Sequence, residues 1–193
     1  WEIVEEIVYL TRLESVEECY RFVELDVREV VGEAIDALGG IAREKGVSVA
    51  RGSWTTAAVR ADGDKLLRVF LNILSNCLRH AASAVSVSVE RAPERVRVVF
   101  RDDGPGFAAE DLDRLFERFY RGRRGDTGLG MAIAKSIVDR HGGSMAADNH
   151  PEGGARFVVL LPCAARGEGL AAREGNYSNC SSSATGGSGP GEV

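Results

Sequence analysis

The chain has 193 residues, 44% of them hydrophobic and 27% charged, and carries a formal net charge of −5. This length and composition fit one sizeable core with extensions and disfavour two full domains. The negative charge disfavours a nucleic-acid-binding surface, and no apolar run approaches the ~20 residues of a membrane span. Widely spaced cysteines without a C-x-x-C pair disfavour a zinc site or a disulfide framework and favour a reducing, cytoplasmic compartment. The start at Trp1, with no signal peptide, suggests a piece of a longer protein.

Helices and short strands alternate in the first part of the chain. Residues 1–19 carry apolar positions at helical spacing among acidic ones, which predicts an amphipathic helix. Asp26 and Glu29 stand in capping-box arrangement at the start of a long amphipathic pattern. We therefore expect strands at 21–25, 47–50 and 57–61, a helix over 26–47, and a second helix from about Asp64 to His80.

The second part of the chain adds a hairpin, two more helices and two final strands. Strands are predicted at 84–90, 95–101, 144–148 and 155–162, and helices at 109–119 and 130–141. This order predicts an α+β fold, a two-layer sandwich in which a mixed, mostly antiparallel sheet carries helices on one face. After Pro162 the composition changes to Gly, Ser, Ala and Glu, so the segment 163–193 is predicted to be disordered.

Two asparagines, Asn72 and Asn76, interrupt the apolar run FLNILSNCLRHA at residues 70–81. Asparagine is a poor helix former with four hydrogen-bonding sites to satisfy, so two of them one turn apart indicate a partner on that helix face. The carbonyl oxygen of Asn76 is a hard, neutral donor of the kind that Mg²⁺ prefers. Arg79 and His80 offer a positive charge for phosphates and a ring that could stack on a base. The alternative is a helix with a polar, solvated face.

Glycine-rich turns follow a strand and precede a helix. RDDGPGF places Asp102, Gly104 and Gly106 at the end of a strand, where the glycines let the backbone come close to a ligand. DTGLGMAIAK places Gly128 and Gly130 at the start of a helix, whose N-terminal N–H groups suit phosphates. GPGFAA also matches a dinucleotide fingerprint, but no second parallel strand with an acidic residue follows it. The sequence contains no Walker-type phosphate loop.

These stretches, together with LFERFYRGRRG, resemble the N, G1, F and G2 boxes of the ATP-binding domain of bacterial sensor histidine kinases in order and spacing. The resemblance covers residues 21–162, and YLTRLES resembles the end of that family's dimerisation hairpin. It implies that residues 1–20 end the phosphoacceptor helix, that 21–162 form the catalytic domain, and that 163–193 are an appended tail. It implies ATP and Mg²⁺ as cofactors.

The resemblance also assigns roles to residues. Asn76 would hold Mg²⁺, and Asp102 would accept a hydrogen bond from the adenine amino group. The loop with Arg121, Arg123 and Arg124 would be the ATP lid, although Asp126 stands where the family commonly has glycine. Phe116 and Phe119 fit the F box, with core packing as the alternative. The implied nucleotide-binding residues are Asn72, Asn76, Arg79, His80, Asp102, Gly104, Gly106, Phe119, Arg124, Thr127, Gly128, Leu129 and Gly130, with Asn72, Asn76 and Arg79 as the catalytic ones.

Position 72 bears on the reaction. Relatives that hydrolyse ATP, such as gyrase-type topoisomerases and ATPase chaperones, have a glutamate there to activate water, and an amide cannot take a proton. The resemblance therefore implies phosphoryl transfer to a histidine, and none of His80, His141 and His150 lies in an H-E-x-x-x-P context. The acceptor would lie outside this chain.

The implied partners are an upstream histidine-bearing dimerisation domain, a response regulator receiver domain and a second copy of the parent protein, with no nucleic acid. The parent would be cytoplasmic or anchored with this part in the cytoplasm. Two alternatives stay open: a non-catalytic nucleotide-binding regulatory module, and an anti-sigma-type serine kinase, a family that lacks the hairpin suggested by YLTRLES.

Overall fold

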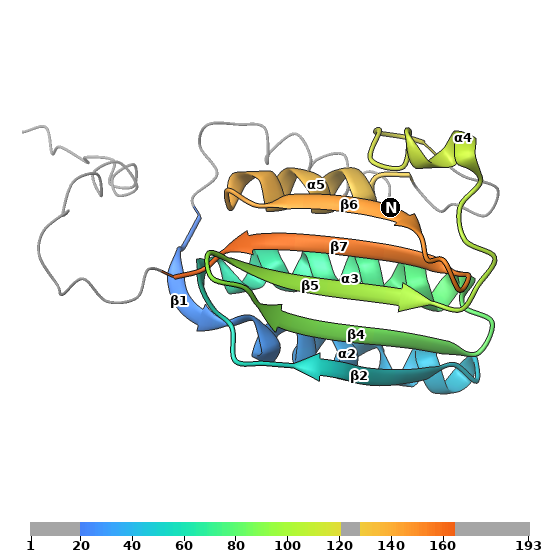
Figure 1. The fold of residues 1–193 in the computed structure, drawn as a ribbon, viewed down its shortest axis with the longest axis horizontal. Helices are drawn as coiled ribbons and strands as arrows, with labels where there is room; N and C mark the ends of the chain where they lie inside the picture. The colour runs from blue at the N-terminus through green and yellow to red at the C-terminus, as the bar shows by residue number, and fades with distance from the viewer. Residues whose placement is uncertain (1–19, 121–127, 165–193) are drawn as a thin grey trace, which may run out of the picture.

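A computed structural model describes residues 20–120 and 128–164 of the chain. Strands and helices are interspersed along its sequence, as Figure 1 shows. In chain order they are β1 (Val23–Asp26), α2 (Val27–Glu44), β2 (Ser48–Trp54), β3 (Ala58–Ala61), α3 (Gly63–His80), β4 (Ala84–Arg91), β5 (Arg95–Asp102), α4 (Ala109–Leu112), α5 (Gly130–Arg140), β6 (Ser144–Asn149) and β7 (Ala155–Pro162).

The main sheet has five strands in the order β2-β4-β5-β7-β6. β2 pairs with β4 in parallel, and every other neighbouring pair is antiparallel. Buried residues alternate with more exposed ones along β5 and β7, so one face of the sheet points to the core. A separate two-stranded pair joins β1 and β3. The mixed, mostly antiparallel sheet predicted from the sequence is confirmed.

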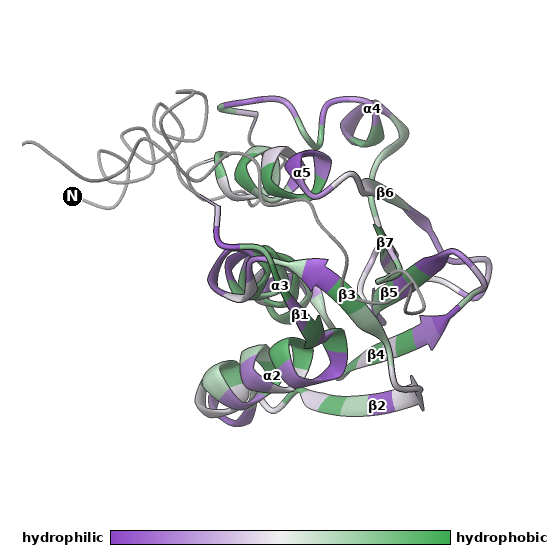
Figure 2. Ribbon diagram, turned by 90° about the vertical axis from the view of Figure 1, so that its left-hand side faces the viewer, coloured by the Kyte–Doolittle hydropathy of each residue, from purple (hydrophilic) through white to green (hydrophobic). Residues whose placement is uncertain are grey.

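Helices α2, α3 and α5 cover one face of this sheet in a single layer, with α3 between the other two (Figures 1 and 2). The apolar face of α3 is completely buried at Leu66, Phe70 and Ile73. The Phe70 ring lies 5.9 Å from that of Phe100 on β5. Because the inner face of α3 packs on the sheet, its polar residues are left for its other faces.

The segment directly before β1 packs against the residue that follows α5 and the residue that precedes α3. Tyr20 and Phe22 contact the ring of His141, which is 6% exposed. The His141 ring hydrogen-bonds through Nδ1 to the Ile137 carbonyl (2.8 Å) and accepts the Asp62 N–H at Nε2 (3.0 Å). Burial lowers the pKa of His141, so the neutral ring is favoured in this structural position.

The predicted helix over 109–119 is wrong beyond its first turn. α4 ends at Leu112, and the chain continues as successive turns in which the N–H groups of Arg114 and Glu117 donate to carbonyls three residues earlier. Phe116 packs against the core, whereas Phe119 is 59% exposed and has a φ of +62°. The bonds to carbonyls three residues earlier replace the α-helical pattern after Leu112, and the left-handed backbone at Phe119 is likewise incompatible with a helix through the end of the predicted range.

Within residues 20–120 and 128–164, no helix has both the length and the apolarity needed to cross a bilayer.

Candidate functional site

Asn72 lies on the part of α3 that faces the start of α5. Its Nδ2 donates to the carbonyl oxygen of Gly130, the first residue of α5, at 2.9 Å. This bond gives Asn72 a partner and joins the predicted N box to the predicted G2 box. Asn76 lies one turn further along α3, half-buried on the same side as Asn72. Arg79 and His80 are half-buried in the last turn of that helix.

Asp102 ends β5 and is only 2% exposed. Its Oδ1 accepts the backbone N–H of Gly104 at 2.9 Å and that of Ala155 at 3.3 Å. Burial raises the pKa of Asp102, while these two hydrogen bonds and the nearby His80 oppose the rise. A carboxyl group held this way in a buried place is a strong, directed acceptor, as recognition of an amino group requires.

The loop after β5 passes against the end of α3. A Cβ at Gly104 would collide with the carbonyl oxygen of His80, so this position needs glycine. Gly106 has a φ of +74° and lies beside the side chain of Asn149. The close approach that the structure shows at these two glycines is to protein atoms. Approach of this backbone to a ligand stays a prediction.

The helix α5 begins at Gly130 after the buried Leu129, an apolar residue with no side-chain cap to offer. Gly128 has a φ of +74°, and its carbonyl accepts the N–H of Phe119 at 2.9 Å. The two ends of the predicted lid are therefore held next to each other. Arg124 and Thr127 lie outside the described residues.

The structure thus brings several predicted residues together. Asn72 contacts Gly130, and the end of α3 at His80 contacts the Gly104 turn that holds Asp102. Phe119 is adjacent to Gly128 at the base of the lid. The predicted site is consequently assembled from α3, the end of β5 and the start of α5.

Sequence reasoning missed several residues that support this site. The carboxylate of Asp103 accepts the N–H groups of Ala82 and Ser83 and the Ser83 hydroxyl, which fixes the turn after α3. Burial opposes ionisation of Asp103, but these hydrogen bonds outweigh it and leave its pKa well below the usual value. The Asn149 side chain hydrogen-bonds to Phe107 in the loop after Asp102, and the Ala155 N–H donates to Asp102 itself. These contacts join segments distant in sequence and leave no local pattern.

Cys77 is fully buried on α3 beside Asp102. Burial, followed by the charge of Asp102, raises the pKa of its thiol well above the usual value. A protonated, enclosed thiol in this place serves packing.

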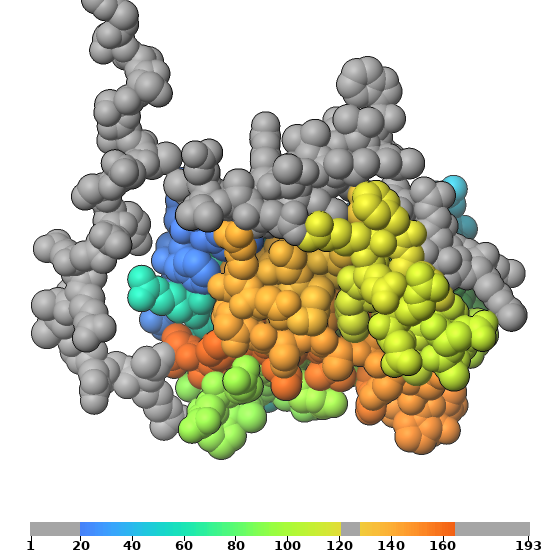
Figure 3. Space-filling view, turned by 90° about the horizontal axis from the view of Figure 1, so that it is seen from above, coloured from blue at the N-terminus to red at the C-terminus, as the bar shows by residue number. Residues whose placement is uncertain are grey.

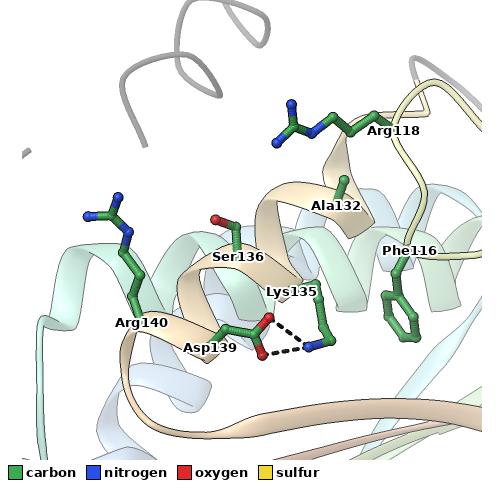
Figure 4. A pocket seen from close by; sticks show the side chains of 7 residues that line it. All are labelled: Phe116, Arg118, Ala132, Lys135, Ser136, Asp139 and Arg140. Atoms are coloured by element: carbon green, nitrogen blue, oxygen red, sulfur yellow. Dashed lines mark hydrogen bonds and ion pairs between the residues drawn. The ribbon is translucent and has the colours of Figure 1, made fainter. Parts of the chain in front are cut away.

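An open hollow lies on another side of α5, lined by Phe116, Arg118, Ala132, Lys135, Ser136, Asp139 and Arg140 (Figure 4). Lys135 donates to both carboxylate oxygens of Asp139 there, at 2.5 and 2.7 Å. Figure 3 shows α5 and the α4 region next to each other on this face of the molecule. Among the residues that the structure describes, the hollow shares none with the predicted nucleotide site.

The donors at the predicted site fit a nucleotide better than a protein-held metal ion. Among residues 20–120 and 128–164, no three histidine, cysteine or carboxylate side chains cluster to hold a metal. The Asn76 amide oxygen is suited to Mg²⁺ that is held largely by phosphates and water. A helix N-terminus in α5 and a buried carboxylate at Asp102 provide complementary places for phosphates and a base.

Comparison with known proteins agrees with this geometry. The family described as histidine kinase-, DNA gyrase B-, and HSP90-like ATPase matches residues 61–165. The histidine-protein kinase AfsQ2 of Streptomyces coelicolor is 33% identical over 171 residues, which is 83% of this chain and 30% of that protein. BaeS of Escherichia coli is 36% identical over 140 residues, covering 66% of this chain and 30% of that protein. The chain therefore spans less than a third of either relative.

Solved structures share the fold. The mycobacterial sensor histidine kinase MprB is 26% identical with a TM-score of 0.66, and the match covers 74% of this chain and 98% of that one. Full-length ShkA, 24% identical, has a TM-score of 0.76 over 84% of this chain and 35% of that one. The predicted α+β architecture is the architecture of these proteins.

Proposed function

The chain belongs to the histidine kinase-, DNA gyrase B- and HSP90-like ATPase family, and from this we propose that it is the ATP-binding catalytic domain of a two-component sensor kinase. It transfers the γ-phosphoryl group of ATP to a histidine outside this chain, on an upstream dimerisation domain. A response regulator receiver domain then takes the phosphoryl group. The parent acts in the cytoplasm as a homodimer.

The contact between Asn72 and Gly130 carries this proposal. It joins the asparagine-bearing face of α3 to the N-terminus of α5, with the Asn72 Nδ2 2.9 Å from the Gly130 carbonyl oxygen. Phosphates at the α5 N-terminus would therefore lie beside Asn76, the proposed Mg²⁺ ligand. Mg²⁺, when bound, neutralises charge on the phosphates and orients them.

Asp102 recognises the adenine amino group in this proposal. Its Oδ1 is fixed by two backbone N–H groups, and the residue is 2% exposed, so the acceptor is already oriented when a base reaches it. Arg79 and His80 border the same end of α3 and add positive charge and a stacking surface. In this proposal the phosphates are contacted from the lid by Arg124 and Thr127, and from the start of α5 by Gly128 and Leu129.

Amide chemistry at position 72 favours transfer over hydrolysis. The Asn72 side chain already donates to Gly130, and it has no basic group to take a proton from water. The site then acts by holding ATP in line with an arriving nucleophile and by stabilising charge. Histidine needs no deprotonation beyond its neutral form to attack, so an amide-lined site suffices.

A binding and hydrolysis experiment tests the proposal. Mg·ATP at a hundredfold excess over its dissociation constant adds about 2.7 kcal/mol and should raise the melting temperature by roughly 5 to 10 °C. Asn76→Ala should remove most of this rise, and phosphate release by the unmodified chain should stay at background. Ser75→Ala, a change at the neighbouring half-buried position, is the control. An equal shift in Asn76→Ala rejects the metal assignment, and rapid phosphate release indicates an ATPase.

A further inference from the structure

The turn end of the β6–β7 hairpin contacts Asp102 and the loop that follows it. Asn149, the last residue of β6, pairs with Ala155, the first residue of β7. The Ala155 N–H donates to Asp102 Oδ1, while the Asn149 side chain reaches the loop that follows Asp102. Of these two paired residues, Ala155 therefore contacts Asp102 directly, and Asn149 contacts the loop that follows it.

Asn149 makes two hydrogen bonds to the backbone of a single residue in that loop. Its Oδ1 accepts the Phe107 N–H at 2.7 Å, and its Nδ2 donates to the Phe107 carbonyl at 2.9 Å. A carboxamide used in this way reproduces the paired bonds of an antiparallel strand at a place where no strand continues. The loop is thus held by a side chain 42 positions away in sequence.

The loop that Asn149 holds also supplies a hydrogen bond to Asp102. Gly104, three residues before Phe107, donates its N–H to Asp102 Oδ1 at 2.9 Å. The same loop is confined on its other side by the His80 carbonyl, which leaves no space for a Cβ at Gly104. Between these two boundaries, the position of Gly104 and the direction of the Asp102 carboxylate depend on where Phe107 is fixed.

Exposure separates this role from a contribution to the core. Asn149 is exposed, and its hydrogen bonds to Phe107 lie at the surface. If the carboxamide is removed, water can satisfy the Phe107 N–H and carbonyl, so little stability is lost. The Phe107 ring keeps its contact with Phe157, 5.4 Å between ring centroids, but the loop loses the two hydrogen bonds that fix its backbone.

We propose that Asn149 is a positioning residue for base selection, which holds the 104–107 loop through Phe107 and so aims Asp102 at the adenine amino group. This inference rests on the proposed function, because it presumes a purine at Asp102. A loop with freedom to move aims the carboxylate poorly, and discrimination between adenine and guanine falls. Phosphate contacts at α5 do not involve this loop and stay as they are.

Binding of ATP and GTP to the full chain tests the inference. Asn149→Ala should reduce the ATP-over-GTP preference by about three- to tenfold, the worth of one or two modest hydrogen bonds. Asn149→Asp keeps the size but loses the donor and places an oxygen against the Phe107 carbonyl, so it should not restore the preference. Glu152→Gln is the matched control. Glu152 lies in the turn of the same β6–β7 hairpin, and the change breaks its exposed ion pair with Arg101 of β5 without touching the 104–107 loop.

Two further readouts separate positioning from folding. In Asn149→Ala, the melting temperature without nucleotide and the affinity for inorganic tripolyphosphate should both equal those of the unsubstituted chain. If that variant does not fold, Asn149→Asp carries the same comparison. An unchanged ATP-over-GTP ratio in the folded variants overturns the inference and leaves the proposed function intact. A parent chain that binds neither nucleotide overturns the proposed function itself.

Discussion

The two ends of the proposed nucleotide site are built differently. At the base end, Asp102 is 2% exposed, lies at the end of a central strand and accepts two backbone N–H groups. At the phosphate end, Phe119 is 59% exposed with left-handed backbone, and it meets Gly128 at the base of the predicted lid. Groups fixed by the sheet suit recognition of one base, whereas loop-borne groups suit contacts that form and release within a reaction cycle.

The largest effect on stability should come from a glycine at the base end. Gly154 has a φ of +86°, and a Cβ there would overlap the Asp102 carbonyl oxygen. Gly154→Ala should lower the free energy of unfolding by about 3 kcal/mol, from backbone strain together with the collision. Gly153→Ala is the control, because Gly153 also has positive φ but open space around it. Urea unfolding of both variants checks the difference, and equal losses would contradict a tightly built base end.

Removing the carboxylate should cost nucleotide selectivity rather than phosphate affinity. Asp102→Ala deletes the proposed adenine acceptor, so we expect about a ten- to hundredfold fall in ATP affinity, as for one charge-assisted hydrogen bond. Affinity for GTP should change little, because its binding rests on the phosphate end. Competition between ATP and GTP measures this, and a preserved ATP preference would remove Asp102 from the site.

A change at Asn72 tests the link between the two ends. Asn72→Asp keeps the side-chain size but replaces the donor to the Gly130 carbonyl with an oxygen. The variant should be destabilised by about 1 to 3 kcal/mol and should bind Mg·ATP more weakly. Asn72→Glu should not hydrolyse ATP rapidly, because its carboxylate would face the Gly130 carbonyl. A stable Asn72→Glu variant with rapid phosphate release would instead place a water-activating position here.

The smallest effect concerns pH at the base end. Burial raises the pKa of Asp102 above its ordinary 3.8, opposed by bonds from Gly104 and Ala155. The favourable contribution of protonated Asp102 to the nucleotide-free fold is therefore present below 3.8 and is lost as pH rises through the raised pKa. ATP affinity has the opposite sign, because the ionised carboxylate is the acceptor, so it should fall as pH drops through that pKa.

ATP affinity measured against pH for the unsubstituted chain, called the parent in this comparison, and for Asp102→Asn isolates this dependence, since protonation of the ATP phosphates affects both proteins alike. The parent should lose a few-fold more affinity than Asp102→Asn as pH falls toward the ordinary aspartate value. Parallel curves would mean that the charge of Asp102 does not contribute to binding.

Much of the fold follows from periodicity in the sequence. The helix predicted from about Asp64 to His80 is α3 at Gly63–His80, and the hairpin of β4 and β5 falls where alternation placed it. The failure lies in 109–119, where apolar spacing predicted a helix, but the turns beyond Leu112 pack the partly buried Phe116 against the core and turn Phe119 outward. Local spacing records apolar positions, whereas the path of a loop is decided by what it packs against.

The candidate site divides along the same line. Asn72, Asp102 and Gly130 could be predicted because their boxes are short and local. Asn149, Gly154 and Ala155 could not, because the groups that they contact lie more than forty positions away in the sequence. A pair of adjacent glycines before a strand was the available signal, and its meaning depends on the β6–β7 register.

Transfer of label from γ-labelled ATP tests the central claim most directly. The chain alone, and the chain mixed with the parent's histidine-bearing hairpin, are incubated with Mg·ATP, and protein-bound phosphate is followed at neutral and acid pH. We predict no labelling of the chain alone and slow, acid-labile labelling of the hairpin, because tethering normally supplies the high effective concentration. Asn76→Ala should abolish it. Tight ATP binding without any transfer to that hairpin would contradict the kinase assignment and indicate a nucleotide-binding regulatory module, and acid-stable label on a serine would indicate a serine kinase.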